Sequence, residues 1–151
     1  LNEQQVLAAM HYPDELFAVP WMKPTYGDPS YIVRDIYRSE NGWWDRNPTT
    51  LHPEPPPAVG EAVAAAITDK AAVIASAQAL ADAGRWQLAL HVIDLLATAS
   101  GPAPEIAHAR RLKAQWLRER ARQVPSYVSR NLYRVGADMI EQGTQDRFGI
   151  H

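Results

Sequence analysis

The chain contains no cysteine, which excludes disulfide bridges, cysteine nucleophiles and zinc sites built on thiolates. It has no apolar run of 18 residues; the nearest, residues 58–67, is mostly alanine and too short to span a bilayer. The net charge is only −2, so no excess of positive charge favours nucleic acid or an anionic membrane. What remains is a domain-sized chain of 151 residues in which no signal peptide is visible, and the cellular compartment stays open.

Local motifs of common catalytic sites are also missing. The histidines never fall in an H-x-H, H-x-x-x-H or H-E-x-x-H spacing, so the chain has no local zinc signature. There is no G-x-S-x-G elbow and no phosphate-binding loop. We therefore expect no catalysis, metal or other cofactor on this chain alone, and we interpret His91, in the middle of a predicted helix, as a solvated or core-edge residue. The five histidines are His11, His52, His91, His108 and His151.

Alanine and helical periodicity dominate the chain after residue 57. Asp69 is a suitable N-cap, Gly84 a stop signal, and Gly84, Trp86 and Ala89 match half of a tetratricopeptide repeat signature. Small residues such as Ala77 and Ala89 would let neighbouring helices approach closely. We predict an all-α fold in which antiparallel helix pairs form a tetratricopeptide-repeat-like stack. The predicted helices cover about 58–67, 69–83, 86–99, 104–123 and 126–142.

Residues 1–57 are predicted to form an irregular N-terminal arm, rich in proline and aromatic residues. Short helices are expected near 1–10 and 14–18, and another begins after Asp28, an N-cap followed by Pro29, and ends at Gly42. Prolines between residues 45 and 57 favour an extended linker. The predicted organisation is an arm and joint over 1–57, a helical body over 58–143 and a C-terminal tail over 144–151.

The basic residues of segment 104–123 allow two interpretations. They form either a solvated helix face with acidic partners such as Glu119, or a positive patch for an anionic partner. Trp116 is the only aromatic residue nearby, which makes base stacking on this face poor. The residues concerned are Arg110, Arg111, Lys113, Arg118, Arg120 and Arg122.

Aromatic residues concentrate in the arm, where three of the five Trp and four of the six Tyr fall within residues 12–44. Such residues commonly pack in a core or an interface. Alternatively they line a substrate cleft, where tyrosine hydroxyls and an arginine such as Arg34 would suit an anionic headgroup on an apolar tail.

Three runs in the arm carry a family resemblance: D-P-S-Y-I-V-R-D-I-Y, then G-W-W-D-R-N-P-T-T-L, then P-P-P. Together they resemble a segment of the metallo-β-lactamase-fold alkyl sulfatases, in which a zinc-binding catalytic domain precedes a helical dimerisation domain. The joint in that family carries V-R-x-[IV]-[YW] and G-W-[FYW]-D-G-N-P. Downstream, A-D-A-G-R-W-Q-L-A and S-R-N-L-Y-R-V-G-A-D-M-I are similar to the dimerisation domain, so the resemblance covers about residues 4–141.

The resemblance implies a homodimer and a full-length parent that is a zinc-dependent sulfuric ester hydrolase acting on alkyl sulfates. Zinc ligands in the family lie upstream of this segment, so this chain would be an excised piece that dimerises and completes the cleft of a catalytic domain. A free-standing helical adaptor that binds a peptide is the alternative. Residues implied to face the catalytic domain or substrate are Tyr26, Tyr31, Arg34, Tyr37, Trp43, Trp44, Asp45 and Asn47.

Two positions depart from the family pattern. Arg46 stands where the pattern has glycine, and Tyr31 aligns with a histidine thought to face the active site. Since a tyrosine hydroxyl with its usual pKa near 10 is a poor proton shuttle, a related ester or lipid-like substrate is a second possibility for the parent.

Overall fold

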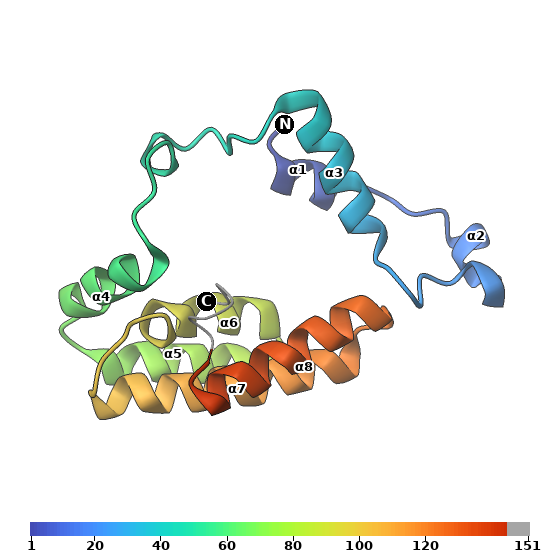
Figure 1. Cartoon of the computed structure of the whole chain (residues 1–151). Helices are drawn as coiled ribbons and strands as arrows, with labels where there is room; N and C mark the ends of the chain where they lie inside the picture. The colour runs from blue at the N-terminus through green and yellow to red at the C-terminus, as the bar shows by residue number, and fades with distance from the viewer. Residues whose placement is uncertain (145–151) are drawn as a thin grey trace. The chain divides into compact units, whose positions relative to one another are not determined.

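The computed structural model describes residues 1–144, and every regular element in that range is helical (Figure 1). This confirms the predicted all-α class. Only Thr144 of the predicted tail, residues 144–151, falls within the described part of the chain. The elements are α1 (Glu3–Ala9), α2 (Asp14–Ala18), η1 (Pro20–Met22), α3 (Pro29–Asn41), η2 (Pro48–Thr50), α4 (Pro56–Ala66), α5 (Lys70–Asp82), α6 (Trp86–Ala97), α7 (Pro104–Gln123) and α8 (Tyr127–Gln142).

The chain divides into two compact units. The first unit consists of residues 1–53 and 124–129. It contains most of the predicted arm, and from here on the name arm refers to this unit. The second, the body, consists of residues 54–123 and the described residues from 130 onward. The first turn of α8 therefore groups with the arm, and the remainder of that helix groups with the body.

Local capping signals explain the helices of the arm. Asn2 and Gln5 form a reciprocal capping box at the start of α1, and the Asp28 carboxylate accepts the Ser30 amide N–H at 2.9 Å at the start of α3. Gly42 ends α3 at φ 78°, a conformation that glycine adopts without steric cost. No residue of α1, α2, η1, α3 or η2 is buried, so these helices do not enclose a core of their own.

The arm is closed by a backbone attachment between residues 25–26 and 127–128. The amide N–H groups of Tyr127 and Val128 donate to the carbonyl oxygens of Thr25 and Tyr26, at 2.6 and 3.0 Å. The first amides of a helix have no partner within it, so these carbonyls satisfy donors that α8 cannot. Ser126 also acts as the predicted cap, because its Oγ accepts the Ser129 amide N–H at 3.2 Å.

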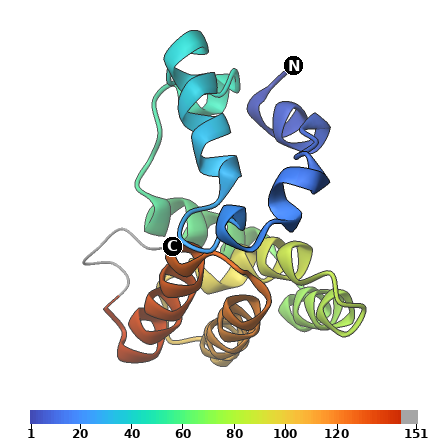
Figure 2. The same ribbon diagram turned by 90° about the vertical axis from the view of Figure 1, so that its right-hand side faces the viewer.

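The core of the body lies between α5, α6 and α7, which pack side by side (Figures 1 and 2). Ala77 of α5 and Ala89 of α6, predicted to let their helices approach closely, are fully buried, and Trp116 of α7 belongs to the same core with 2% of its surface exposed. Alanines at the contact let helix backbones approach closely. The backbone of α4 also comes close to the end of α6: a Cβ placed on Gly60 would lie 2.7 Å from the Thr98 carbonyl carbon.

The linker differs from the sequence prediction. Pro56 and Pro57 were expected in an extended connection, yet they form the first turn of α4. Amide hydrogens in a first turn have no partner within the helix, so proline loses no hydrogen bond there and its fixed φ suits the helix.

The basic residues of α7 mostly bind within the chain, which favours the structural interpretation over an anion-binding patch. Arg110 donates to the carbonyl oxygens of Ala97 and Ala99 at 3.2 and 2.6 Å, which caps the end of α6. Arg118 pairs with Glu141 and Asp138 of α8, and both carboxylates raise the pKa of Arg118.

Other basic residues of α7 find partners nearby or on α8. Arg122 pairs with Glu119, and the Arg120 guanidinium lies 5.8 Å from the centre of the Tyr133 ring. Lys113 corrects the expectation of a solvated face, because its side chain is buried and its Nζ lies 2.8 Å from Asp94 Oδ1 of α6.

Candidate functional site

The turn after α3, residues 42–50, is built around Asp45 and Asn47. The Asp45 carboxylate accepts the Asn47 amide N–H at 2.9 Å and the Thr50 hydroxyl at 2.5 Å. The Asn47 side chain accepts the Thr49 amide N–H, and the Trp44 indole N–H donates to the Asn47 carbonyl oxygen at 3.2 Å. The Thr50 hydroxyl and the Asn47 amide hold the pKa of Asp45 below its ordinary value. Asp45 and Asn47 therefore shape the turn.

The same turn places Arg46 in the left-handed region, at φ 67°, the only non-glycine residue with a positive φ in the described chain. A side chain at such a φ costs roughly 1–2 kcal/mol relative to the right-handed region. This explains in physical terms why glycine suits the position in the family pattern. The turn leaves Trp43 strongly exposed.

The tyrosines of the arm have distinct environments. The Tyr31 hydroxyl and Ser129 Oγ share a short hydrogen bond of 2.5 Å, which joins α3 to the first turn of α8. Tyr26 stacks on Tyr127, with ring centres 6.2 Å apart. The Tyr37 hydroxyl donates to the Leu1 carbonyl oxygen at 3.2 Å. None of these rings is fully buried, and Tyr26 is largely exposed.

Two hollows occur in the arm. One, of about 110 Å³, is lined by Tyr37, Trp43, Trp44 and Asp45 together with Glu3 and Arg38. The other, about 330 Å³, is an apolar groove between α1 and α3. Four of the eight candidate residues thus share one hollow, whereas Tyr26 and Tyr31 belong to the attachment with residues 126–129.

Sequence reasoning missed Glu3 and Arg38. Glu3 pairs with Arg38 at 3.0 Å and with Arg34 at 3.7 Å, so the guanidinium of Arg34 is engaged within the arm. Opposite charges on two amphipathic helices were visible in the sequence, but nothing local indicated that α1 and α3 lie side by side.

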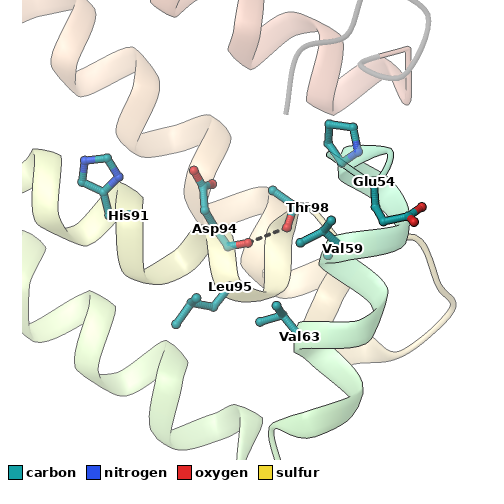
Figure 3. Close-up of a pocket in the computed structure, with 9 residues that line it drawn as sticks. Glu54, Val59, Val63, His91, Asp94, Leu95 and Thr98 are labelled. Carbon is teal, nitrogen blue, oxygen red and sulfur yellow. Dashed lines mark hydrogen bonds between the residues drawn. The ribbon is translucent and has the colours of Figure 1, made fainter. Parts of the chain in front are cut away.

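A hollow of about 410 Å³ lies between α4 and α6 of the body (Figure 3). Val59 and Val63 of α4 face Leu95 of α6 across it, while His91 and Asp94 lie along its edge. His91 is exposed, which favours the solvated one of its two predicted environments. Asp94 is held by Lys113, so the edge carries a neutralised carboxylate and the groove is mainly apolar.

Within residues 1–144, no three side chains of His, Asp or Glu converge to hold a metal ion. Over the same range, no helix combines the length and the apolar character needed to cross a membrane.

Comparison with known proteins gives a consistent set of relatives. A family model described as alkyl sulfatase dimerisation matches residues 2–143. The chain is 32% identical over 122 residues to the alkyl/aryl-sulfatase BDS1 of Saccharomyces cerevisiae, covering 81% of this chain and 18% of that protein. It is 29% identical over 131 residues to an (R)-specific secondary-alkylsulfatase of a Pseudomonas species, covering 87% and 19%.

A solved structure of similar fold is the stereoselective inverting sec-alkylsulfatase Pisa1 from a Pseudomonas species. Its TM-score is 0.75 at 25% identity, and the match covers all of this chain and 23% of the other. The S233Y F250G double mutant of the same enzyme gives a TM-score of 0.76 at 26% identity over 95% of this chain and 22% of the other. This chain therefore spans about a fifth of the length of these relatives.

Proposed function

The chain belongs to the alkyl sulfatase dimerisation family, and on that basis we propose that it is the segment through which two copies of an alkylsulfatase-like protein associate. The family match over residues 2–143 carries this proposal. A second observation supports it: the helices of the arm bury none of their apolar residues, although Trp21, Tyr26 and Trp43 present large rings to solvent. Rings of this kind contribute roughly 150–250 Å² each when covered, so a partner surface would recover much of this area.

Co-expression of two differently tagged copies of the 151-residue chain tests the association. Capture through one tag should retain the other copy in comparable amount after washing. Recovery of the captured copy alone would contradict the proposal.

A more detailed proposal concerns the longer protein of which this chain would be a segment. It holds that the parent is a zinc-dependent hydrolase of sulfate esters and that this segment completes the cleft of its catalytic domain. In this proposal the zinc belongs to the catalytic domain of the longer protein; residues 1–144 bring together no group of three His, Asp or Glu side chains for it. The body is proposed to be a repeat-like stack of helix pairs.

Within that proposal, the hollow lined by Tyr37, Trp43, Trp44 and Asp45 is the part of the arm that faces the catalytic domain or substrate. Trp43 is the best residue with which to test this role, because its ring is exposed. Replacing its side chain leaves the hydrogen bonds of the turn intact. Trp43→Ala in the longer protein should raise KM for an alkyl sulfate about tenfold, whereas Leu88→Ala on α6 should not. Equal KM values for the two variants would contradict a role in the cleft.

A peptide-binding adaptor is the alternative function, and the groove between α4 and α6 is the feature that favours it. A folded monomer that binds a defined peptide through Val59 and Leu95 would support the adaptor.

A further inference from the structure

The last residue of α3, Asn41, is followed by Gly42, a pair whose chemistry favours deamidation. The backbone nitrogen of the residue after an asparagine can attack the side-chain amide carbon. Glycine is the residue that hinders this attack least, because it has no side chain and lets the backbone approach closely. Asn41 is the one asparagine of the 151-residue sequence that precedes a glycine. The other three precede Glu3, Pro48 and Leu132.

Both reacting groups lie at the surface of the arm. Asn41 and Gly42 are exposed, and α3 has no buried residue. Among the described residues, nothing apart from the chain neighbours of Gly42 lies within 4 Å of a Cβ placed on it. Water therefore reaches the pair, and the space around the attacking nitrogen is open enough for a five-membered ring to form.

Two hydrogen bonds protect the pair while the helix is intact. The Gly42 amide N–H donates to the Arg38 carbonyl oxygen at 2.9 Å. Asn41 Nδ2 donates to the Tyr37 carbonyl oxygen, also at 2.9 Å. The attacking nitrogen must lose its proton, and the bond to Arg38 holds that proton in place. Because both bonds lie at an exposed helix end, where local opening costs little free energy, the reaction proceeds from the open form of this turn.

We propose that Asn41 is a site of spontaneous deamidation, controlled by opening of the last turn of α3. In the open turn the Gly42 nitrogen gives up its proton and bonds to Cγ of Asn41. The bond from Cγ to Nδ2 breaks, the side-chain nitrogen takes up a proton and leaves as ammonia, and a succinimide remains. Water then adds to one of the two ring carbonyl carbons and opens the ring, which gives aspartate or isoaspartate. Water is the only co-reactant.

The product changes the end of α3 at the edge of the two hollows described in the arm. Asn41 lines the apolar groove between α1 and α3. Gly42 lines the hollow that also contains Trp43 and Trp44. Either product replaces a hydrogen-bond donor with a carboxylate at the negative end of the helix dipole, which is unfavourable. Isoaspartate also lengthens the backbone by one carbon before Trp43, so deamidation should loosen the turn.

Peptide mapping by mass spectrometry of the 151-residue chain tests the proposal. During incubation at mildly alkaline pH, the segment that contains Asn41 should gain the mass difference between an amide and an acid, as separate aspartate and isoaspartate products. The exposed Asn47 is a natural control, because Pro48 has no backbone N–H and the same ring cannot form. Conversion at Asn47 or Asn131 as fast as at Asn41, or no conversion at Asn41, would overturn the assignment.

A synthetic peptide with the sequence of residues 36–46 supplies the unprotected rate, because an isolated segment this short forms little helix in water. The 151-residue chain should deamidate about tenfold more slowly than the peptide, since its two hydrogen bonds must open first. Asn41→Gln is the matched control in the chain: its longer side chain would have to close a six-membered ring and should give no product over the same time. Equal rates in chain and peptide would overturn control by α3.

Asn41→Asp reproduces one product and tests its effect on the turn. Hydrogen exchange at the Gly42 amide should become about fivefold faster, because the donor to Tyr37 is lost and the new charge opposes the helix dipole. Gln142→Glu, which places a carboxylate at the end of α8 instead, should leave this exchange unchanged. Unchanged exchange in Asn41→Asp would overturn the expected loosening. The inference goes beyond the proposed function, and none of these results depends on whether two copies associate.

Discussion

At the scale of single residues, the turn after α3 is shaped by Asp45 and strained at Arg46. The carboxylate of Asp45 holds the Asn47 amide and the Thr50 hydroxyl, and this geometry forces the intervening Arg46 to a positive φ. The hydrogen bonds of the turn must therefore offset the steric cost of a side chain in the left-handed region.

Arg46→Gly should stabilise the turn by about 1 kcal/mol, because glycine removes the steric cost, and this gain exceeds the larger backbone entropy that glycine loses on folding. Hydrogen exchange at the Thr49 and Thr50 amides, which are bonded within the turn, should slow about fivefold. Arg111→Gly within α7 is the control: it should destabilise the chain by about 1 kcal/mol, since glycine is unfavourable inside a helix. Faster exchange in Arg46→Gly would show that the arginine side chain stabilises the turn.

The lowered pKa of Asp45 predicts how the turn responds to acid. A carboxyl group whose pKa is lower in the folded turn stabilises it above the unfolded pKa, about 3.9. That stabilisation is lost as the pH falls through the folded value. The Trp44 indole proton should therefore keep its NMR shift from pH 7 to pH 5 and move only below about pH 4. Asp45→Asn should abolish this acid transition, whereas a midpoint above pH 5 would contradict the assignment.

Not every feature at this scale was visible in the sequence. The unusual residue Arg46 was visible, because the family pattern has glycine at that position. The bond between Tyr31 and Ser129 was not, since 98 residues separate its partners and neither has a pattern that indicates the other. The burial of Lys113 was missed for a similar reason: its partner Asp94 lies on a different helix, and lysine is usually exposed.

At the scale of helices, the sequence predicted most boundaries closely because the signals are local. Asn2, Asp28, Asp69 and Ser126 all accept the backbone hydrogen bonds expected of N-caps. The start of α4 was missed because the same prolines that favour an extended linker are tolerated in a first helical turn. Which helices touch depends on side-chain shape over long sequence distances, and local patterns do not encode it.

The contact between α4 and α6 depends on the absence of a side chain at Gly60. Gly60→Ala would place a Cβ 2.7 Å from the Thr98 backbone and push the helices apart. Overpacking typically costs 1–3 kcal/mol, which exceeds the gain of up to about 1 kcal/mol in helix propensity. We expect a net loss of about 1–2 kcal/mol in urea unfolding.

Gly101→Ala is the matched control, because the nearest atom to its added Cβ would be 3.5 Å away. It should be neutral or slightly stabilising, since alanine restricts the unfolded chain. Equal effects of the two substitutions would show that α4 does not depend on this close approach.

At the scale of the whole molecule, the two units differ in how they are stabilised. The body encloses Ile93, Leu96 and Trp116 and has a core of its own. The arm has no comparable core in its helices and depends on capping, on ion pairs such as Glu3 with Arg38, and on the hydrogen bonds that join its two segments, residues 1–53 and 124–129. Exposed aromatic residues in the arm leave apolar surface for association.

Sedimentation equilibrium of the 151-residue chain across about 1–100 µM tests the account most directly. A dimer that buries a standard-sized interface typically dissociates at or below the micromolar range, so the apparent mass should rise toward twice that of the single chain. A mass equal to one chain at every concentration, for a chain shown to be folded by circular dichroism, would contradict self-association.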